Sequence, residues 1–167
     1  MDRSTAHDPR AIANLILDMR EDGGKPLTIM QLIKLIYIAD GWSIVLLGHP
    51  LSKEAPKAWQ YGPVYPTVYR AFSGAGARPV SARAVVKGTA IPLAEDFSEE
   101  ESNLIKMVVD SYGKLSAFAL SNLTHQQDTP WSRAYDKGIY TDISLADIQE
   151  HYESLKETRL VNHQAGA

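Results

Sequence analysis

The sequence predicts a mainly α-helical (α+β) fold: a compact single-domain helical bundle around a central buried helix, with a small β-strand or hairpin element. Three observations lead to this prediction. The stretch 27–48 is apolar on nearly every side of a helix, and the segments around it carry apolar residues at helical spacing. Only residues 80–92 show the alternation of apolar and polar residues that is typical of a strand.

The central helix has clear start and stop signals. Thr28 and Gln31 have the spacing of a capping box, in which each side chain bonds a free amide of the first turn. Gly48 follows the apolar stretch, and a residue without a Cβ atom favours the turn that ends a helix. We therefore predict a helix that other helices surround.

A membrane-spanning helix is the alternative interpretation of this stretch, because about 20 apolar residues cross a bilayer. Lys34 and Asp40 argue against it. Each would cost about 2.5–3.5 kcal/mol near the bilayer centre, and their separation prevents them from pairing along one helix face. We expect a buried core helix and no membrane association.

Capping residues, prolines and glycines delimit the other predicted helices. These helices begin at Pro9, Pro66, Ser98, Ser116, Thr129 and Ser144. Helical periodicity ends near Glu157, which predicts one domain over residues 1–157 and a disordered tail over 158–167. The proline-rich connector 49–66 excludes a continuous helix, and the alternation around Val80–Val86 predicts the strand or hairpin.

Composition limits the class of protein. The chain has 167 residues, 44% of them hydrophobic, a net charge of -3 and no cysteine. These values fit one domain with a substantial core, and they exclude disulfides, thiol nucleophiles and thiolate metal sites. The N-terminal residues lack the pattern of a signal peptide. We expect a cytoplasmic protein.

Charge is distributed unevenly. Residues 55–94 contain no Asp or Glu but carry +5, and an acidic cluster follows at 95–101. The five cations of this basic block are Lys57, Arg70, Arg78, Arg83 and Lys87. Such a block indicates either an acidic partner or nucleic acid, or a surface whose charges pair locally with the acidic cluster.

Motifs for catalysis are missing from the sequence. There is no serine on a glycine elbow, no P-loop and no HExxH pattern. His125 and Asp128 have a spacing that would suit one metal ion, but a histidine in such a loop more often holds two segments together by hydrogen bonds. We expect no enzyme activity, no metal site and no cofactor.

Three motifs together resemble the Panacea domain family, which includes phage-associated proteins of the GepA type and SocA-like antitoxins. They are a KLxY helix at Lys34–Tyr37, a tryptophan followed by YGPV at 59–64, and LTH at 123–125 with a downstream PW at 130–131. The resemblance covers roughly residues 27–134. Ile33, Ile36 and Asp40 depart from the family pattern, and Asp40 is the departure that could change a local hydrogen bond.

The resemblance implies a mostly helical domain that binds and neutralises a cognate toxin protein. In one branch of the family the antitoxin is a proteolytic adaptor that delivers its toxin to a ClpXP-type protease. On this basis we expect partner contacts from the aromatic connector and its neighbour, namely Trp59, Tyr61, Tyr65 and Arg70. Lys34, His125 and Trp131 are expected to support that connector from inside.

The alternative function is nucleic-acid binding or transcriptional regulation through the basic block, residues 55–94. The overall negative charge and the lack of a clear recognition helix make nucleic acid the less favoured partner.

Overall fold

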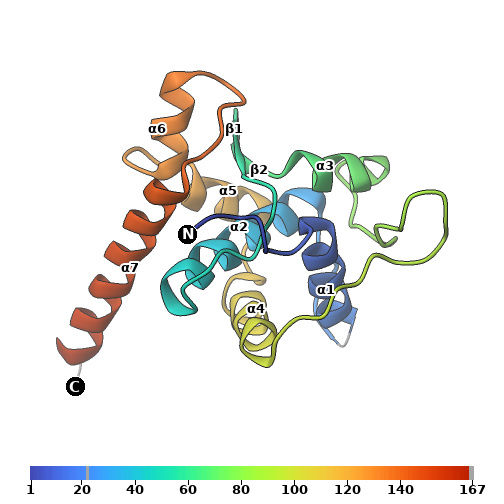
Figure 1. The fold of residues 1–167 in the computed structure, drawn as a ribbon, viewed down its shortest axis with the longest axis horizontal. Coiled ribbons are helices and arrows are strands. Elements are labelled where there is room, and N and C mark those ends of the chain that lie inside the picture. The colour runs from blue at the N-terminus through green and yellow to red at the C-terminus, as the bar shows by residue number, and fades with distance from the viewer. Residues whose placement is uncertain (22, 166–167) are drawn as a thin grey trace.

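The structure is a computed structural model that describes residues 1–21 and 23–165. Figure 1 shows the order of its elements along the chain. The helices are α1 (Pro9–Glu21), α2 (Ile29–Leu46), α3 (Pro66–Phe72), α4 (Glu99–Tyr112), α5 (Ala117–Thr124), α6 (Pro130–Lys137) and α7 (Leu145–Ala165), with a short 3₁₀ turn, η1 (Ser73–Ala75). The strands β1 (Lys57–Trp59) and β2 (Gly62–Val64) form one antiparallel hairpin. The predicted mainly α-helical fold with a small β element is confirmed.

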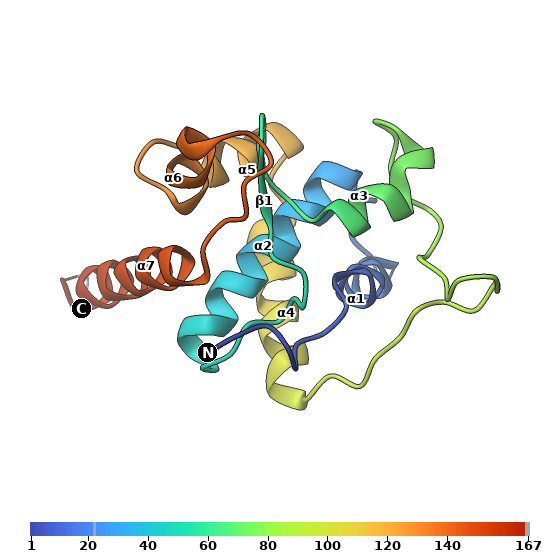
Figure 2. The same ribbon diagram turned by 45° about the horizontal axis from the view of Figure 1, so that its top comes forward.

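Helix α2 lies at the centre of the bundle, as predicted (Figures 1 and 2). Helices α1, α3, α4, α5 and α7 and strand β2 all pack against it. Thr28 and Gln31 form the predicted capping box, and Gly48 follows the helix with φ +83°. By length and composition α2 could cross a membrane, but 78% of its apolar window is buried inside the protein. Its position is that of a core helix and is consistent with a soluble protein.

The predicted helix starts are also confirmed. Ser98 and Glu101 form a second capping box at α4, Ser116 caps α5, and Thr129 caps α6 with Pro130 in its first turn. Pro66 begins α3. Helices α3, α4 and α5 pack against α2, and α6 packs against β1 and α7, so that the helices share one core.

The predicted position of the β element is wrong. The hairpin lies in the connector, at 57–64, whereas residues 80–92 contain one isolated bridge between Val85 and Pro92. The buried Asn14 side chain explains this loop, because it bonds the backbone of Ala84 and Leu93 in place of a neighbouring strand. Alternation at 80–86 therefore reflects a loop anchored to α1.

Helix α7 continues to Ala165, whereas the sequence predicted disorder from residue 158. Arg159 gives a physical reason for the difference. Its guanidinium lies 4.6 Å from the centre of the Trp42 ring and donates a hydrogen bond to the hydroxyl of Tyr112 at 2.5 Å. These contacts hold the last part of α7 against the bundle. Residues 166–167 of the predicted tail lie outside the described residues.

Candidate partner-binding surface

The β1–β2 hairpin presents the aromatic connector at the protein surface. Trp59 faces Gly62 across the hairpin, and Gly62 adopts φ +115°, a backbone conformation that favours glycine. The other edge of β1 is also occupied. Ala58 donates its amide to the carbonyl of Thr141 and accepts a hydrogen bond from the amide of Tyr140, both at 2.8 Å. The segment that follows α6 in the chain therefore lies beside the hairpin and places Tyr140 next to it.

Four aromatic rings from three parts of the chain line one cleft, which we call the aromatic cleft. The rings belong to Trp59, Tyr61, Tyr69 and Tyr140. Trp59 lies edge-on between Tyr69, at 5.2 Å between ring centres, and Tyr140, at 5.7 Å. Tyr61 is 63% exposed and Tyr140 is 58% exposed. The cleft has a volume of ≈ 290 Å³. Rigid, accessible aromatic rings of this kind are the side chains that anchor protein–protein contacts.

Trp131 of the PW motif and Ser121, which lies just before the LTH motif, hold the hairpin from the side of α5 and α6. Trp131 donates its indole N–H to the carbonyl of Trp59 at 2.7 Å, and Ser121 donates its hydroxyl to the carbonyl of Tyr61 at 2.6 Å. His125 lies edge-on to Trp131, with 5.4 Å between ring centres, and contacts the Ser121 carbonyl. Trp131 therefore contacts the connector directly, whereas His125 contacts Trp131 and Ser121, which in turn bond the connector.

Lys34 supports the hairpin from the core side. Its side chain is fully buried, and its Nζ donates a hydrogen bond to the carbonyl of Pro63 at 2.7 Å. Burial lowers the pKa of Lys34 to about 7, because the charged ammonium is poorly solvated there. The amine therefore contacts β2 directly beneath the aromatic cleft.

Tyr65 differs from the other predicted contact residues, because its side chain is fully buried. Its hydroxyl donates a hydrogen bond to Asp40 Oδ2 at 3.0 Å. Burial, followed by the charge of Asp40, raises the pKa of Tyr65 well above its usual value. A partner cannot reach this ring, so the expectation of direct contact does not hold for Tyr65. Its neighbours Val64 and Pro66 are buried as well, so this part of the connector lies inside the protein.

Asp40 is a buried anion that organises the start of the connector. Its carboxylate accepts hydrogen bonds from the amides of Leu51, at 2.8 Å, and Ser52, at 3.1 Å, in addition to Tyr65. Arg3 provides the compensating charge at 2.8 Å. Burial of a carboxylate is tolerated where a cation and several donors surround it. The departure of Asp40 from the family pattern is thus accommodated by a complete set of partners.

Arg70 is exposed on α3 next to Tyr69, a position open to a partner.

Other cations of the basic block pair with carboxylates outside the acidic cluster. Lys57 pairs with Asp142, and Arg83 pairs with Asp18 and Glu21. The acidic cluster bonds the histidines instead. Glu95 and Glu101 contact His7, and Glu101 also contacts His49. Within the described residues, local pairing between the basic block and the acidic cluster is therefore not observed.

Neither Tyr69 nor Tyr140 was predicted from the sequence as a residue of the cleft. Both rings approach Trp59 through tertiary contacts, so spacing in the sequence does not reveal them. Tyr140 lies at φ +68° in the turn after α6, a conformation that non-glycine residues rarely adopt and that is seen only in the structure. Among the described residues, no group of three potential ligand side chains is placed to hold a metal ion.

Comparison with known proteins gives two matches. The family described as "Antitoxin SocA-like, Panacea domain" matches residues 32–132, a range that includes β1, β2 and the residues that support them. Antitoxin SocA from Caulobacter vibrioides (strain NA1000 / CB15N) is 35% identical over 128 residues, which cover 74% of this chain and 68% of that protein. No solved structure matches the chain significantly.

Proposed function

The chain belongs to the SocA-like Panacea domain family, and on this premise we propose that it is an antitoxin that binds and neutralises a cognate toxin protein. The observation that carries this proposal is the aromatic cleft, in which the rings of Trp59, Tyr61 and Tyr69 lie within the residues that match the family, and Tyr140 follows them in the chain. The proposed role requires no catalytic group, since binding alone neutralises the toxin.

The proposed contact surface consists of the aromatic cleft and Arg70. The backbone carbonyls of Trp59 and Tyr61 accept hydrogen bonds from Trp131 and Ser121, so the backbone that carries these rings is fixed before a partner binds. A preorganised surface loses little conformational entropy on binding, which favours affinity. Arg70 would add a charge-assisted contact to an acidic group of the toxin. The toxin would then be neutralised by masking of its active surface.

We also propose an adaptor function as the finer mechanism. The bound toxin would be delivered to a ClpXP-type protease in the cytoplasm, and the protein would act there without enzyme activity of its own. Masking and delivery differ in one observable respect. Masking leaves the amount of toxin unchanged, whereas delivery shortens the lifetime of the toxin in cells that contain the protease.

The experiment is an affinity purification of the tagged chain from its native host, with mass spectrometry of the recovered proteins. A near-stoichiometric partner encoded by the adjacent gene supports the antitoxin function, and protease subunits recovered beside it support the adaptor. Binding of that partner is then compared between the wild type, Tyr61→Ala/Tyr140→Ala and the control Met107→Ala. Met107 is 49% exposed on α4 and does not line the cleft.

We expect the double cleft variant to weaken binding at least about tenfold and the Met107 variant to bind normally. Equal binding by all three proteins would refute the cleft as the contact surface.

Nucleic acid remains the second candidate partner, because three cations of the basic block form no ion pair within the described residues. They are Arg70, Arg78 and Lys87. Recovery of nucleic acid without a protein partner, with an affinity that falls steeply with salt, would favour that alternative.

A further inference from the structure

The N-terminal arm, residues 1–8, is fastened across the start of the connector. The amide of His7 donates to the carbonyl of Leu51 at 2.8 Å, and the amide of Lys53 donates to the carbonyl of His7 at 2.7 Å. Farther along the arm, Arg3 reaches the buried Asp40 carboxylate and the carbonyl of Ser52. The arm therefore supplies the cation that compensates Asp40, whose carboxylate in turn orders the connector.

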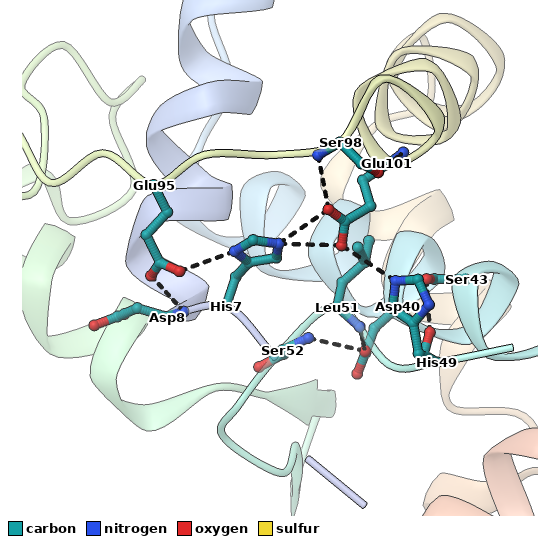
Figure 3. Close-up of polar contacts among 10 residues, drawn as sticks. All are labelled: His7, Asp8, Asp40, Ser43, His49, Leu51, Ser52, Glu95, Ser98 and Glu101. Atoms are coloured by element: carbon teal, nitrogen blue, oxygen red, sulfur yellow. Dashed lines mark hydrogen bonds and ion pairs between the residues drawn. The ribbon is translucent and has the colours of Figure 1, made fainter. Parts of the chain in front are cut away.

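The His7 ring lies between two carboxylates, as Figure 3 shows. Its Nδ1 is 2.8 Å from Glu95 Oε1, and its Nε2 is 3.1 Å from Glu101 Oε2. The other oxygen of Glu95 accepts the amide of Asp8 at 2.8 Å. The Phe97 ring packs on the imidazole at 4.2 Å between ring centres. Both ring nitrogens of His7 thus contact acceptors, one on the segment that leads into α4 and one in the first turn of α4.

The number of ring protons that these two hydrogen bonds require identifies the charge state of His7. A neutral imidazole has one N–H, and ionised carboxylates only accept hydrogen bonds. Two hydrogen bonds to carboxylates therefore require both ring nitrogens to be protonated. We propose that His7 is an imidazolium latch, which fixes the N-terminal arm over the Asp40 carboxylate and releases it when the second ring proton is lost.

The other charged groups around His7 are compatible with this role. Glu101 accepts hydrogen bonds from the amide of Ser98 and from both histidines. Burial acts to raise the pKa of Glu101, but these hydrogen bonds together lower it, which keeps the carboxylate ionised. The other charged groups on the arm, the connector start and the segment 95–101 are Asp2, Arg3, Asp8 paired with Arg10, His49, Lys53, Glu54, Asp96, Glu99 and Glu100.

Loss of the second proton places a nitrogen lone pair against a carboxylate oxygen, so one of the two His7 contacts must break. Besides the His7 ring, the arm is held by two backbone hydrogen bonds to the connector, by the bond from the Asp8 amide to Glu95 and by Arg3, so its release would break these bonds and withdraw Arg3 from Asp40. A buried carboxylate without its cation is strongly unfavourable. The latch would thereby transmit a change of pH to the connector that begins at His49 and leads to the hairpin.

The test exploits the variant Glu95→Gln. The amide group of Gln can accept from Asp8 and donate to a neutral His7, so this variant satisfies both contacts without the extra proton. The Glu95 side chain is partly exposed and Gln has the same size, so the substitution is compatible with the fold. His49→Gln is the matched control, because His49 contacts the same Glu101 but makes no bond to the arm.

The measurement is amide hydrogen exchange of His7 and Lys53 from about pH 6 to about pH 9, with rates corrected for the intrinsic pH dependence of exchange. We expect protection to fall at least about tenfold in the wild type and in His49→Gln, and to stay constant in Glu95→Gln. Core amides of α2 serve as the internal reference. Protection that is independent of pH in the wild type, or an unchanged pH dependence in Glu95→Gln, would overturn the proposal.

Discussion

Trp131 donates its indole N–H to the backbone carbonyl of Trp59 at 2.7 Å and so connects α6 to the first strand of the hairpin. The two residues belong to different motifs and lie 72 positions apart in the sequence. Their contact explains why one motif accompanies the other: PW provides the donor that holds the tryptophan before YGPV in place. The aromatic cleft therefore depends on residues that do not line it.

Trp131→Phe should remove this hydrogen bond while retaining an aromatic ring against Tyr135. We expect a loss of about 1 kcal/mol in the free energy of unfolding, since the Trp59 carbonyl loses its donor. Urea denaturation measures the change. Tyr135→Phe is the control, because it alters the same stacked pair without removing the contact to Trp59. A Trp131→Phe protein as stable as this control would show that the hydrogen bond contributes nothing.

Tyr65 and Tyr61 should respond oppositely to truncation, although they are close in the sequence. Tyr65→Ala should lower the free energy of unfolding by about 3–5 kcal/mol, because it removes a fully buried ring and the hydroxyl that bonds Asp40. Tyr61→Ala should change it by less than about 0.5 kcal/mol, since its side chain is 63% exposed. Thermal and urea unfolding of both variants test this contrast. Similar losses in the two proteins would contradict the burial assigned to Tyr65.

Local signals were sufficient to predict the helices. Thr28, Ser98 and Thr129 each cap a helix through their own side chain and a residue three positions later, so the relevant interaction is contained in a short stretch of sequence. The central position of α2 followed from its apolar faces, because a helix of this kind needs neighbours on most sides.

Tertiary contacts explain what the sequence did not reveal. The Asn14 side chain turns the alternating segment 80–92 into an anchored loop, and Tyr140 reaches Trp59 only because its backbone bonds Ala58. Tyr65 was assigned to the surface because the connector is rich in aromatic residues. Its burial depends on Asp40, a partner on α2 that provides an acceptor inside the core. Such long-range partners are not encoded in local periodicity.

Gly62→Ala should be strongly destabilising because two effects combine. The residue adopts φ +115°, and an added Cβ atom would lie 2.9 Å from Lys34 Nζ. We expect a loss of about 1–3 kcal/mol in the free energy of unfolding, together with weaker partner binding as the hairpin shifts. Gly74→Ala is the control, because a Cβ atom there meets open space. Urea denaturation of both variants measures the change in the free energy of unfolding. Equal values for the two variants would contradict the close approach of Lys34 to the hairpin.

The buried Lys34 should make the protein more stable as the pH rises above neutrality. Its pKa is lowered to about 7 in the folded protein by burial, whereas an unfolded chain retains a value of about 10.4. Between these values the unfolded state binds the additional proton, so raising the pH favours the folded state. Below about pH 7 both states are protonated, and this contribution no longer changes with pH.

We expect the contribution of Lys34 to increase the free energy of unfolding by on the order of 1 kcal/mol per pH unit between about pH 7 and about pH 9.5. The upper limit avoids the range in which tyrosines of the unfolded chain deprotonate. Lys34→Met fills similar space without a titrating group, so urea denaturation across this range should give a smaller slope than in the wild type. Identical slopes would mean that the Lys34 amine remains charged beneath Pro63, and that the core accommodates an ammonium group at this position.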